Sequence, residues 1–234
     1  MQKTSQRLVF LGVLLCLFSG ACGLPRDPEV TLDRVSGGTL SVGISEHDPW
    51  VLLTDEGPAG VEVEIVKRFA ADIDAEIEWI EGEVHELAGA LHMREIDLLI
   101  AGLTSSSTIS SEGALTHPYL TTQVVVATPP GPQVEDIAGI EVAVENATEE
   151  AGVLEKTDAI PMRVDDVTDA GGAVAVDNYL LDDLELADTG VRLSETDHVM
   201  AVPHGENEWL VRLERFLLTR PREIDRILEE HDGL

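Results

Sequence analysis

Basic residues and cysteines are scarce in this sequence, and each shortage excludes a class of protein. The 234 residues include 15 lysines and arginines against 45 aspartates and glutamates, which gives a formal net charge of −30. A surface this acidic repels phosphates, so we expect no nucleic-acid partner. Of the two cysteines, Cys16 lies in a segment that we expect to be removed on export. Cys22 would then be the lone cysteine, which cannot form an internal disulfide.

Several catalytic and cofactor patterns are also missing. The sequence contains no Ser-His-Asp spacing, no cluster of metal ligands and no glycine-rich phosphate loop, and its seven histidines are scattered. We therefore expect no metal, no cofactor and no catalysis of these kinds. Hydrophobic residues make up 44% of the chain, which is enough to form a sizeable core.

Long apolar runs are absent except for one near the start of the chain. Residues 8–18 read LVFLGVLLCLF, with Lys3 and Arg7 before them and the small residues 19–21 after them. This run is shorter than the roughly 20 apolar residues that a transmembrane helix needs. The pattern predicts a signal peptide over residues 1–21.

The residues that follow the apolar run predict a lipid anchor. The order Ser-Gly-Ala-Cys at 19–22 resembles a bacterial lipobox, whose cysteine becomes the lipidated first residue of the mature protein. Ser19 stands where an aliphatic residue is usual, so an ordinary signal peptide with an incidental Cys22 is the alternative. A lipid on Cys22 would anchor the protein at the outer face of a membrane, with residues 22–38 as the lipidated start and tether.

The rest of the chain alternates short apolar segments with segments of helical periodicity, which predicts an α/β fold with largely parallel sheets. The expected strands are 39–44, 75–80, 96–101, 123–127, 141–144, 161–164, 172–176 and 198–202. The expected helices are 61–73, 83–93, 148–154, 178–184, 207–218 and 221–231.

An ordered set of motifs then indicates a class of protein. The set is SVGI (41–44), DPW (48–50), GVEVEI (60–65), IDLLIAGLT (96–104), PY (118–119) and GAVAVD (172–177). This order resembles the extracellular solute-binding proteins of the amino-acid ABC-transporter type, family 3. No single motif is decisive, but the set spans nearly all of the chain after the tether.

The resemblance implies a two-lobed, periplasmic-binding-protein-like type II fold, in which each lobe is a mainly parallel sheet flanked by helices. Residues 39–123 with 199–234 would form lobe 1, and residues 124–198 would form lobe 2. A small polar solute would bind in the cleft between the lobes. The protein would be an extracytoplasmic monomer that works with an ABC-transporter permease.

Three residues after the strand at 96–101 are candidates for the rim of this cleft. Gly102 allows close approach of the backbone, and the hydroxyls of Thr104 and Ser106 can donate and accept hydrogen bonds to a solute. The alternative is that these hydroxyls cap a following helix or lie in a solvated loop.

Three further candidates come from other segments. Trp50 offers a flat wall or a cation–π face, or else packs in the core. Asp177 matches the aspartate that receives an α-amino group in the family, and Thr148 lies in a degenerate form of a family turn. Each of these two residues could instead be only a helix N-cap.

The position that binds a ligand carboxylate in the family has lost its arginine. Five residues after Thr104 the sequence has Ile109, which cannot pair with a carboxylate. The resemblance therefore implies a cationic or neutral solute that is not a standard α-amino acid.

Two other functional classes stay open, a sensor and an enzyme. A sensor or partner-binding lipoprotein of the same fold would dock a receptor or enzyme in place of a permease. A few proteins of this fold resemble prephenate or arogenate dehydratases, which need a general acid and cationic groups for two carboxylates. Glu145 could be the acid, but basic residues are scarce.

Overall fold

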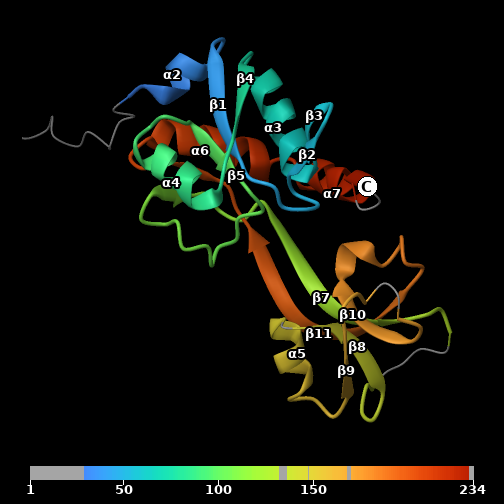
Figure 1. Cartoon of the computed structure of the whole chain (residues 1–234). Coiled ribbons are helices and arrows are strands. Elements are labelled where there is room, and N and C mark those ends of the chain that lie inside the picture. Colours follow the sequence, from blue (N-terminus) through green and yellow to red (C-terminus); the bar gives the residue numbers. More distant parts are fainter. Residues whose placement is uncertain (1–28, 132–135, 147, 168–169, 232–234) are drawn as a thin grey trace, which may run out of the picture.

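The protein consists of two lobes joined by two long strands (Figure 1). The structure, a computed structural model, describes residues 29–131, 136–146, 148–167 and 170–231. The predicted signal peptide, residues 1–21, and Cys22 lie outside the described residues. The two-lobed type II fold that the sequence predicts is confirmed.

Lobe 1 is built on a five-stranded mixed sheet. Strand β1 is parallel to its neighbours β4 and β5, whereas β12 is antiparallel to β5 and β6. In sheet order the strands are β4 (Glu76–Glu81), β1 (Thr39–Ile44), β5 (Leu98–Ile100), β12 (Ala201–Pro203) and β6 (Gly113–Leu115). The helices are α2 (Thr31–Val35), α3 (Val61–Asp72), α4 (Val84–His92), α6 (Asn207–Leu218) and α7 (Pro221–His231), and a hairpin joins β2 (Leu52–Thr54) to β3 (Gly57–Ala59).

Helices on both faces bury the centre of this sheet. Successive side chains of a strand point to opposite faces, and β5 follows this rule. Leu98 and Ile100 pack in the cluster that contains Phe69 of α3 and Trp209 of α6. Leu99 packs in a second cluster with α4. This arrangement explains why every residue of β5 is apolar and buried.

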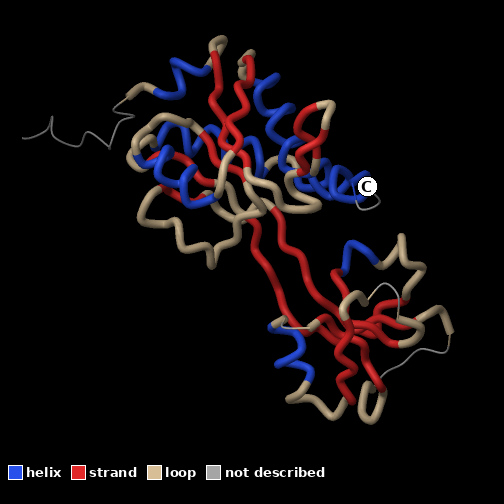
Figure 2. The backbone as a smooth tube through the Cα atoms, in the orientation of Figure 1, coloured by secondary structure: helices blue, strands red, loops and turns tan. Residues whose placement is uncertain are grey.

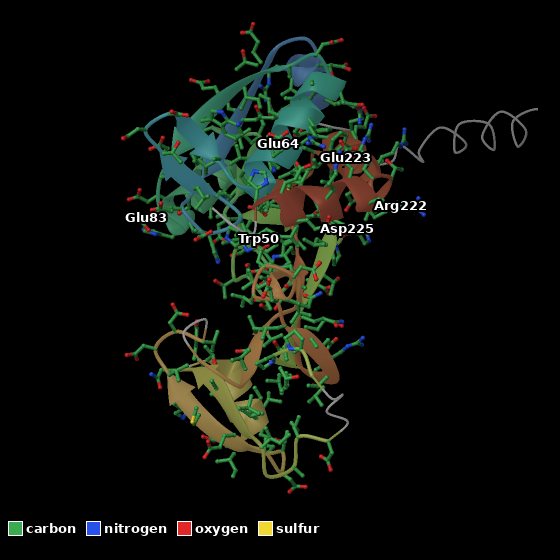
Figure 3. The ribbon with its side chains drawn as sticks, turned by 90° about the vertical axis from the view of Figure 1, so that its right-hand side faces the viewer. Trp50, Glu64, Glu83, Arg222, Glu223 and Asp225 are labelled. Atoms are coloured by element: carbon green, nitrogen blue, oxygen red, sulfur yellow. The ribbon has the colours of Figure 1, made fainter. Side chains whose placement is uncertain are left out.

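Ion pairs join α3 to the C-terminal helix of lobe 1. Arg68 donates to Glu64 one turn earlier at 3.1 Å and to Glu223 of α7 at 2.7 Å. Figure 3 shows Glu64 and Glu223 close together on these two helices. The end of the chain therefore returns to pack on the first half of lobe 1.

Lobe 2 has its own five-stranded sheet with fewer helices. Its order is β11-β7-β10-β8-β9, with β8 parallel to β9 and β10 and with β7 antiparallel to β10 and β11. The strands are β7 (Leu120–Thr128), β8 (Glu141–Glu145), β9 (Ile160–Val164), β10 (Ala173–Asp177) and β11 (Ala187–His198). The helical segments are α5 (Glu149–Leu154) and the 3₁₀ turn η1 (Asn178–Leu180).

The two strands that cross between the lobes are β7 and β11. They pair antiparallel from Leu120 opposite His198 to Thr128 opposite Ala187 (Figure 2). Both sheets are consequently mixed rather than mainly parallel, because each contains antiparallel pairs at the side where the chain crosses.

Two further expected features differ from the structure. The helix expected over 178–184 is only the short turn η1, because Asp177 makes no side-chain capping bond and Asn178 instead accepts the Gln123 amide of β7 at 2.8 Å. Part of the expected tether is folded: α2 packs on lobe 1, where Arg34 hydrogen-bonds to the buried carboxylate of Asp97.

Candidate functional site

A cavity of about 310 Å³ lies in lobe 2 where β8 and β10 end. These strands are parallel neighbours, so their carboxyl ends meet and bring Glu145 and Asp177 to the same edge of the sheet. Thr148, at the start of α5, also lines the cavity. The complete lining is Val124, Val144, Glu145, Thr148, Glu150, Val167, Ala175, Val176, Asp177, Leu180 and Thr196.

The cavity borders the crossing strands. Val124 of β7 and Thr196 of β11 belong to its lining. Asp177 pairs with Val124, which lies four residues after β7 begins at Leu120. The cavity therefore opens at the end of lobe 2 that is nearer to lobe 1, which is where a cleft between the lobes must lie.

Carboxylates give this cavity its chemical character. Glu145, Glu150 and Asp177 line it, and none of its described lining residues is basic. The pKa of Asp177 is raised to about 6, chiefly by burial and then by the charges of Glu150 and Glu145, whereas a hydrogen bond from Tyr179 opposes the rise. A cation placed here would relieve this repulsion, so the geometry favours a positively charged group.

Two of the cavity's polar side chains are held by their neighbours. The hydroxyl of Thr148 accepts the Ala151 amide at 3.4 Å and donates to the Glu145 carbonyl at 3.1 Å, which is the N-cap that we gave as its alternative role. Glu150 accepts a hydrogen bond from Ser194 of β11 at 2.6 Å. Fixed groups lose little further freedom when a solute binds, which favours affinity.

Replacing Tyr179 by phenylalanine tests the electrostatics of the cavity. The phenol hydrogen bond lowers the pKa of Asp177, so the Tyr179→Phe variant should titrate Asp177 above pH 6. Carboxyl carbon NMR of Asp177 against pH measures this midpoint in both proteins. An unchanged or lower midpoint in the variant would show that the phenol does not stabilise the carboxylate.

In lobe 1, Trp50 lies in the core at the end that faces the crossing strands (Figure 3). Its side chain is buried, and its ring stacks on that of His198 with 3.9 Å between centroids. His198 is the last residue of β11, so the tryptophan packs against the point where the second crossing strand enters lobe 1.

Gly102 lies close to side chains of lobe 1. Its φ is +59°, and an added Cβ would lie 2.7 Å from Nδ1 of His47 and 2.8 Å from Cδ1 of Trp50. Its amide donates to the buried carboxylate of Glu62 at 2.8 Å. The space is thus filled by protein side chains of lobe 1.

A Gly102→Ala substitution should therefore be costly. Both the left-handed backbone and the crowding oppose it, and we expect the free energy of unfolding to fall by about 2 kcal/mol or more. Gly37→Ala is the matched control, since Gly37 has a φ of +70° with nothing within 4 Å of its added Cβ. Urea denaturation of both variants separates the effect of crowding from that of backbone strain. Equal losses of unfolding free energy in the two variants would show that crowding at Gly102 contributes nothing.

Thr104 and Ser106 bond to each other rather than to a helix. Their hydroxyl oxygens lie 2.8 Å apart, and the Thr104 amide donates to Ser107 Oγ at 2.9 Å. Turns and no helix occupy residues 105–112, so these hydroxyls do not cap a following helix. Thr104 also pairs with His198 in an isolated bridge, which fixes the loop beside β11.

Ile109 lies in the interior of lobe 1. It is 8% exposed and packs in the cluster that contains Leu87, Leu91 and Val199. The residue at the family's arginine position is thus part of the hydrophobic core. The described residues place no guanidinium there.

The structure brings together only some of the predicted site residues. Thr148 and Asp177 share the lobe 2 cavity, whereas Trp50, Gly102, Thr104 and Ser106 do not line it. We did not predict Glu150 or Tyr179 as site residues. The sequence offered one signal for Glu145, which directly follows an expected strand as Asp177 does.

The described residues contain neither a metal-binding cluster nor a membrane-spanning helix. In that part of the chain, no group of three or more His, Cys, Asp or Glu side chains is arranged to hold a metal ion. Among the same residues, no helix combines the length and the apolar character that a membrane crossing requires.

Part of the chain is similar in sequence to a much longer protein. It is 28% identical over 106 residues to membrane-bound lytic murein transglycosylase F of Vibrio cholerae serotype O1, a match covering 44% of this chain and 20% of that protein. The chain thus spans about a fifth of that relative's length.

Solved structures share the fold at low identity. The unliganded, open L-cystine solute receptor of Neisseria gonorrhoeae has a TM-score of 0.73 at 15% identity, over 86% of this chain and 96% of that one. An ancestral cationic amino acid solute-binding protein has a TM-score of 0.66 at 17% identity, over 86% and 99%. The model of bacterial extracellular solute-binding proteins, family 3, matches residues 40–231, and this chain belongs to that family.

Proposed function

We propose that this protein captures a small cationic solute without an α-carboxylate and delivers it to an ABC transporter. The observation that carries the proposal is the lobe 2 cavity, where Glu145, Glu150 and Asp177 line about 310 Å³ of space without a basic neighbour in the described lining. That volume is at the lower end of the range for small-molecule sites. A cation bound there would be paired with carboxylates on several sides.

The interior position of Ile109 supports the proposal that the solute lacks an α-carboxylate. A bidentate arginine is the best partner for a planar carboxylate. In this chain the corresponding side chain is apolar and packs in the core of lobe 1. An amino acid would bring a carboxylate next to an acidic cavity with no guanidinium at that position, and the repulsion would weaken its binding.

Lobe closure would complete the site. Thr104 pairs with His198, which lies two residues beyond the cavity-lining Thr196 on β11. Two residues of an extended strand span about 7 Å, so the Thr104 and Ser106 hydroxyls lie near the cavity's lobe 1 side. Bending about β7 and β11 would bring them toward the solute while Trp50 and Gly102 support the loop from behind.

The cellular setting follows from family membership and from the start of the chain. Proteins of this family are extracytoplasmic, and the apolar run before Cys22 supports export and lipid attachment. We infer a monomer anchored to the membrane that presents its solute to a permease. We infer a binding protein rather than a dehydratase-like enzyme, because the described lining of the cavity has no cationic group for an anionic substrate.

A thermal-shift panel tests the proposed solute class. The purified protein is screened against amino acids, polyamines, quaternary amines and sugars. A solute at 100 times its dissociation constant should add about 2.7 kcal/mol of stability. Stabilisation by amines would support the proposal, whereas a flat response to all amines would contradict it and favour a sensor that binds a protein partner.

The affinity for a cationic solute should depend on pH. Because the pKa of Asp177 is raised to about 6, the carboxylate is mostly ionised at pH 7 and mostly protonated at pH 5. We expect the dissociation constant to rise about tenfold between these values, since one pH unit below the pKa leaves about a tenth of the group ionised. Calorimetric titration at both values measures it, and a constant affinity would contradict the role of Asp177.

A further inference from the structure

A buried carboxylate in lobe 1 joins the loop after β5 to the start of the first crossing strand. Glu62 lies in the first turn of α3 and is 0% exposed. Its Oε2 accepts the amide of Gly102 at 2.8 Å, and its Oε1 accepts the phenol of Tyr119 at 2.9 Å. These partners lie 40 and 57 residues away in the sequence.

The two partners of Glu62, Gly102 and Tyr119, each lie near one end of a strand. Gly102 follows β5 and leads directly into the loop that carries Thr104. Tyr119 immediately precedes β7, and its amide donates to the carbonyl of His198 at 3.0 Å, where β11 ends. One carboxylate therefore contacts both the loop beside the cavity and the point where the two crossing strands meet lobe 1.

We propose that Glu62 is a positioning residue that ties the Gly102 loop to the crossing strands, and that the strength of this tie depends on its ionisation. An ionised carboxylate accepts both bonds, and charge-assisted bonds are roughly twice as strong as neutral ones. A protonated carboxyl has one oxygen as a donor, so the Tyr119 hydroxyl must turn and accept. The loop and the crossing strands are then held more weakly.

The carboxyl group of Glu62 ionises near physiological pH. Burial raises the pKa of Glu62 to about 7, and the hydrogen bonds from Gly102, Tyr119 and the Ala101 amide oppose the rise. Burial, followed by the charge and hydrogen bond of Glu62, raises the pKa of Tyr119 well above its usual value, so the phenol keeps its proton.

The imidazole of His198 does not account for a transition at this pH. Burial and then the neighbouring His47 lower the pKa of His198 to about 4, with Asp197 opposing, so His198 is neutral near pH 7. Its Nε2 lies 2.9 Å from Thr122 Oγ1. His47 Nδ1 lies 3.0 Å from the Ala101 carbonyl. We assign the change near pH 7 to Glu62, and the Glu62→Gln variant below separates it from any change at His47.

Amide NMR tests the tie without any solute, so its outcome is independent of the proposed function. The backbone amides of the purified protein are followed from pH 5.5 to pH 9. We expect the amides of Gly102, Tyr119 and Leu120 to shift with one midpoint near pH 7. In Glu62→Gln this transition should vanish, and in Tyr119→Phe, where one opposing hydrogen bond is lost, the midpoint should move upward.

Glu64→Gln is the matched control. Glu64 lies in the same turn of α3 (Figure 3). It is partly exposed and pairs with Arg68, so this variant should keep the transition. A transition that persists in Glu62→Gln, or that is absent from the native protein, would overturn the proposal. A transition at Gly102 alone, without Tyr119 and Leu120, would also overturn it, because Glu62 would then titrate without tying the two parts together.

Discussion

Replacing Asp177 by asparagine is expected to weaken the binding of a cationic solute by about 100-fold, while the fold stays intact. Losing one partner of a buried charge pair costs about 2–5 kcal/mol of binding free energy, and each 1.4 kcal/mol is tenfold. Titration calorimetry at pH 7.5 measures the change. Asp182→Asn is the matched control, because Asp182 is exposed and does not line the lobe 2 cavity.

The same variant should lose affinity but keep or gain stability in the absence of solute. The pKa of Asp177 is raised from 3.8 to about 6, so the stability that it contributes is present below 3.8 and is lost as the pH rises through 6. At pH 8 the solute-free Asp177→Asn variant should therefore unfold at the same or a higher temperature than the native protein. A variant with unchanged affinity, or with lowered solute-free stability, would contradict this role.

Replacing Trp209 by alanine is expected to lower the free energy of unfolding by about 3–5 kcal/mol. Trp209 is 0% exposed, its ring lies 5.4 Å from that of Phe69, and its Nε1 donates to the Asp97 carbonyl at 2.8 Å. The indole belongs to α6, which follows the second crossing strand, so the substitution tests whether the chain's return completes lobe 1.

Urea denaturation measures this loss, with Val211→Ala as the matched control. Val211 lies on the same helix and is 49% exposed, so its truncation should change stability by less than about 0.5 kcal/mol. A loss below about 1 kcal/mol for Trp209→Ala would show that α6 is not an integral part of the lobe 1 core.

Strong apolar periodicity made part of the fold predictable. The strand at Thr39–Ile44 has the bounds that the sequence predicts, and α3 ends one residue before the predicted limit. The strand β11 was missed because it crosses between lobes with most of its side chains partly or fully exposed. Its backbone pairing with β7 stabilises it, and hydrophobic alternation does not reveal such pairing.

The site was predictable only in part, for a related reason. Asp177 ends an apolar strand, and the carboxyl ends of parallel strands are where sites form in α/β proteins, so its place could be inferred. The position of Glu150 depends on how α5 packs against β11, which local sequence does not determine. The motif order gave the chain position of Ile109 but not the direction of its side chain, which points into the core.

The most direct test of the account compares matched solutes that differ by one carboxylate. Agmatine and arginine share a guanidinium, and cadaverine and lysine share a terminal ammonium, but only the amino acids carry an α-carboxylate. The account predicts that at pH 7.5 calorimetry gives at least tenfold tighter binding for the amine of a pair, and that Asp177→Asn weakens the binding of both amines by about 100-fold. Tighter binding of both amino acids than of their amines would contradict the account.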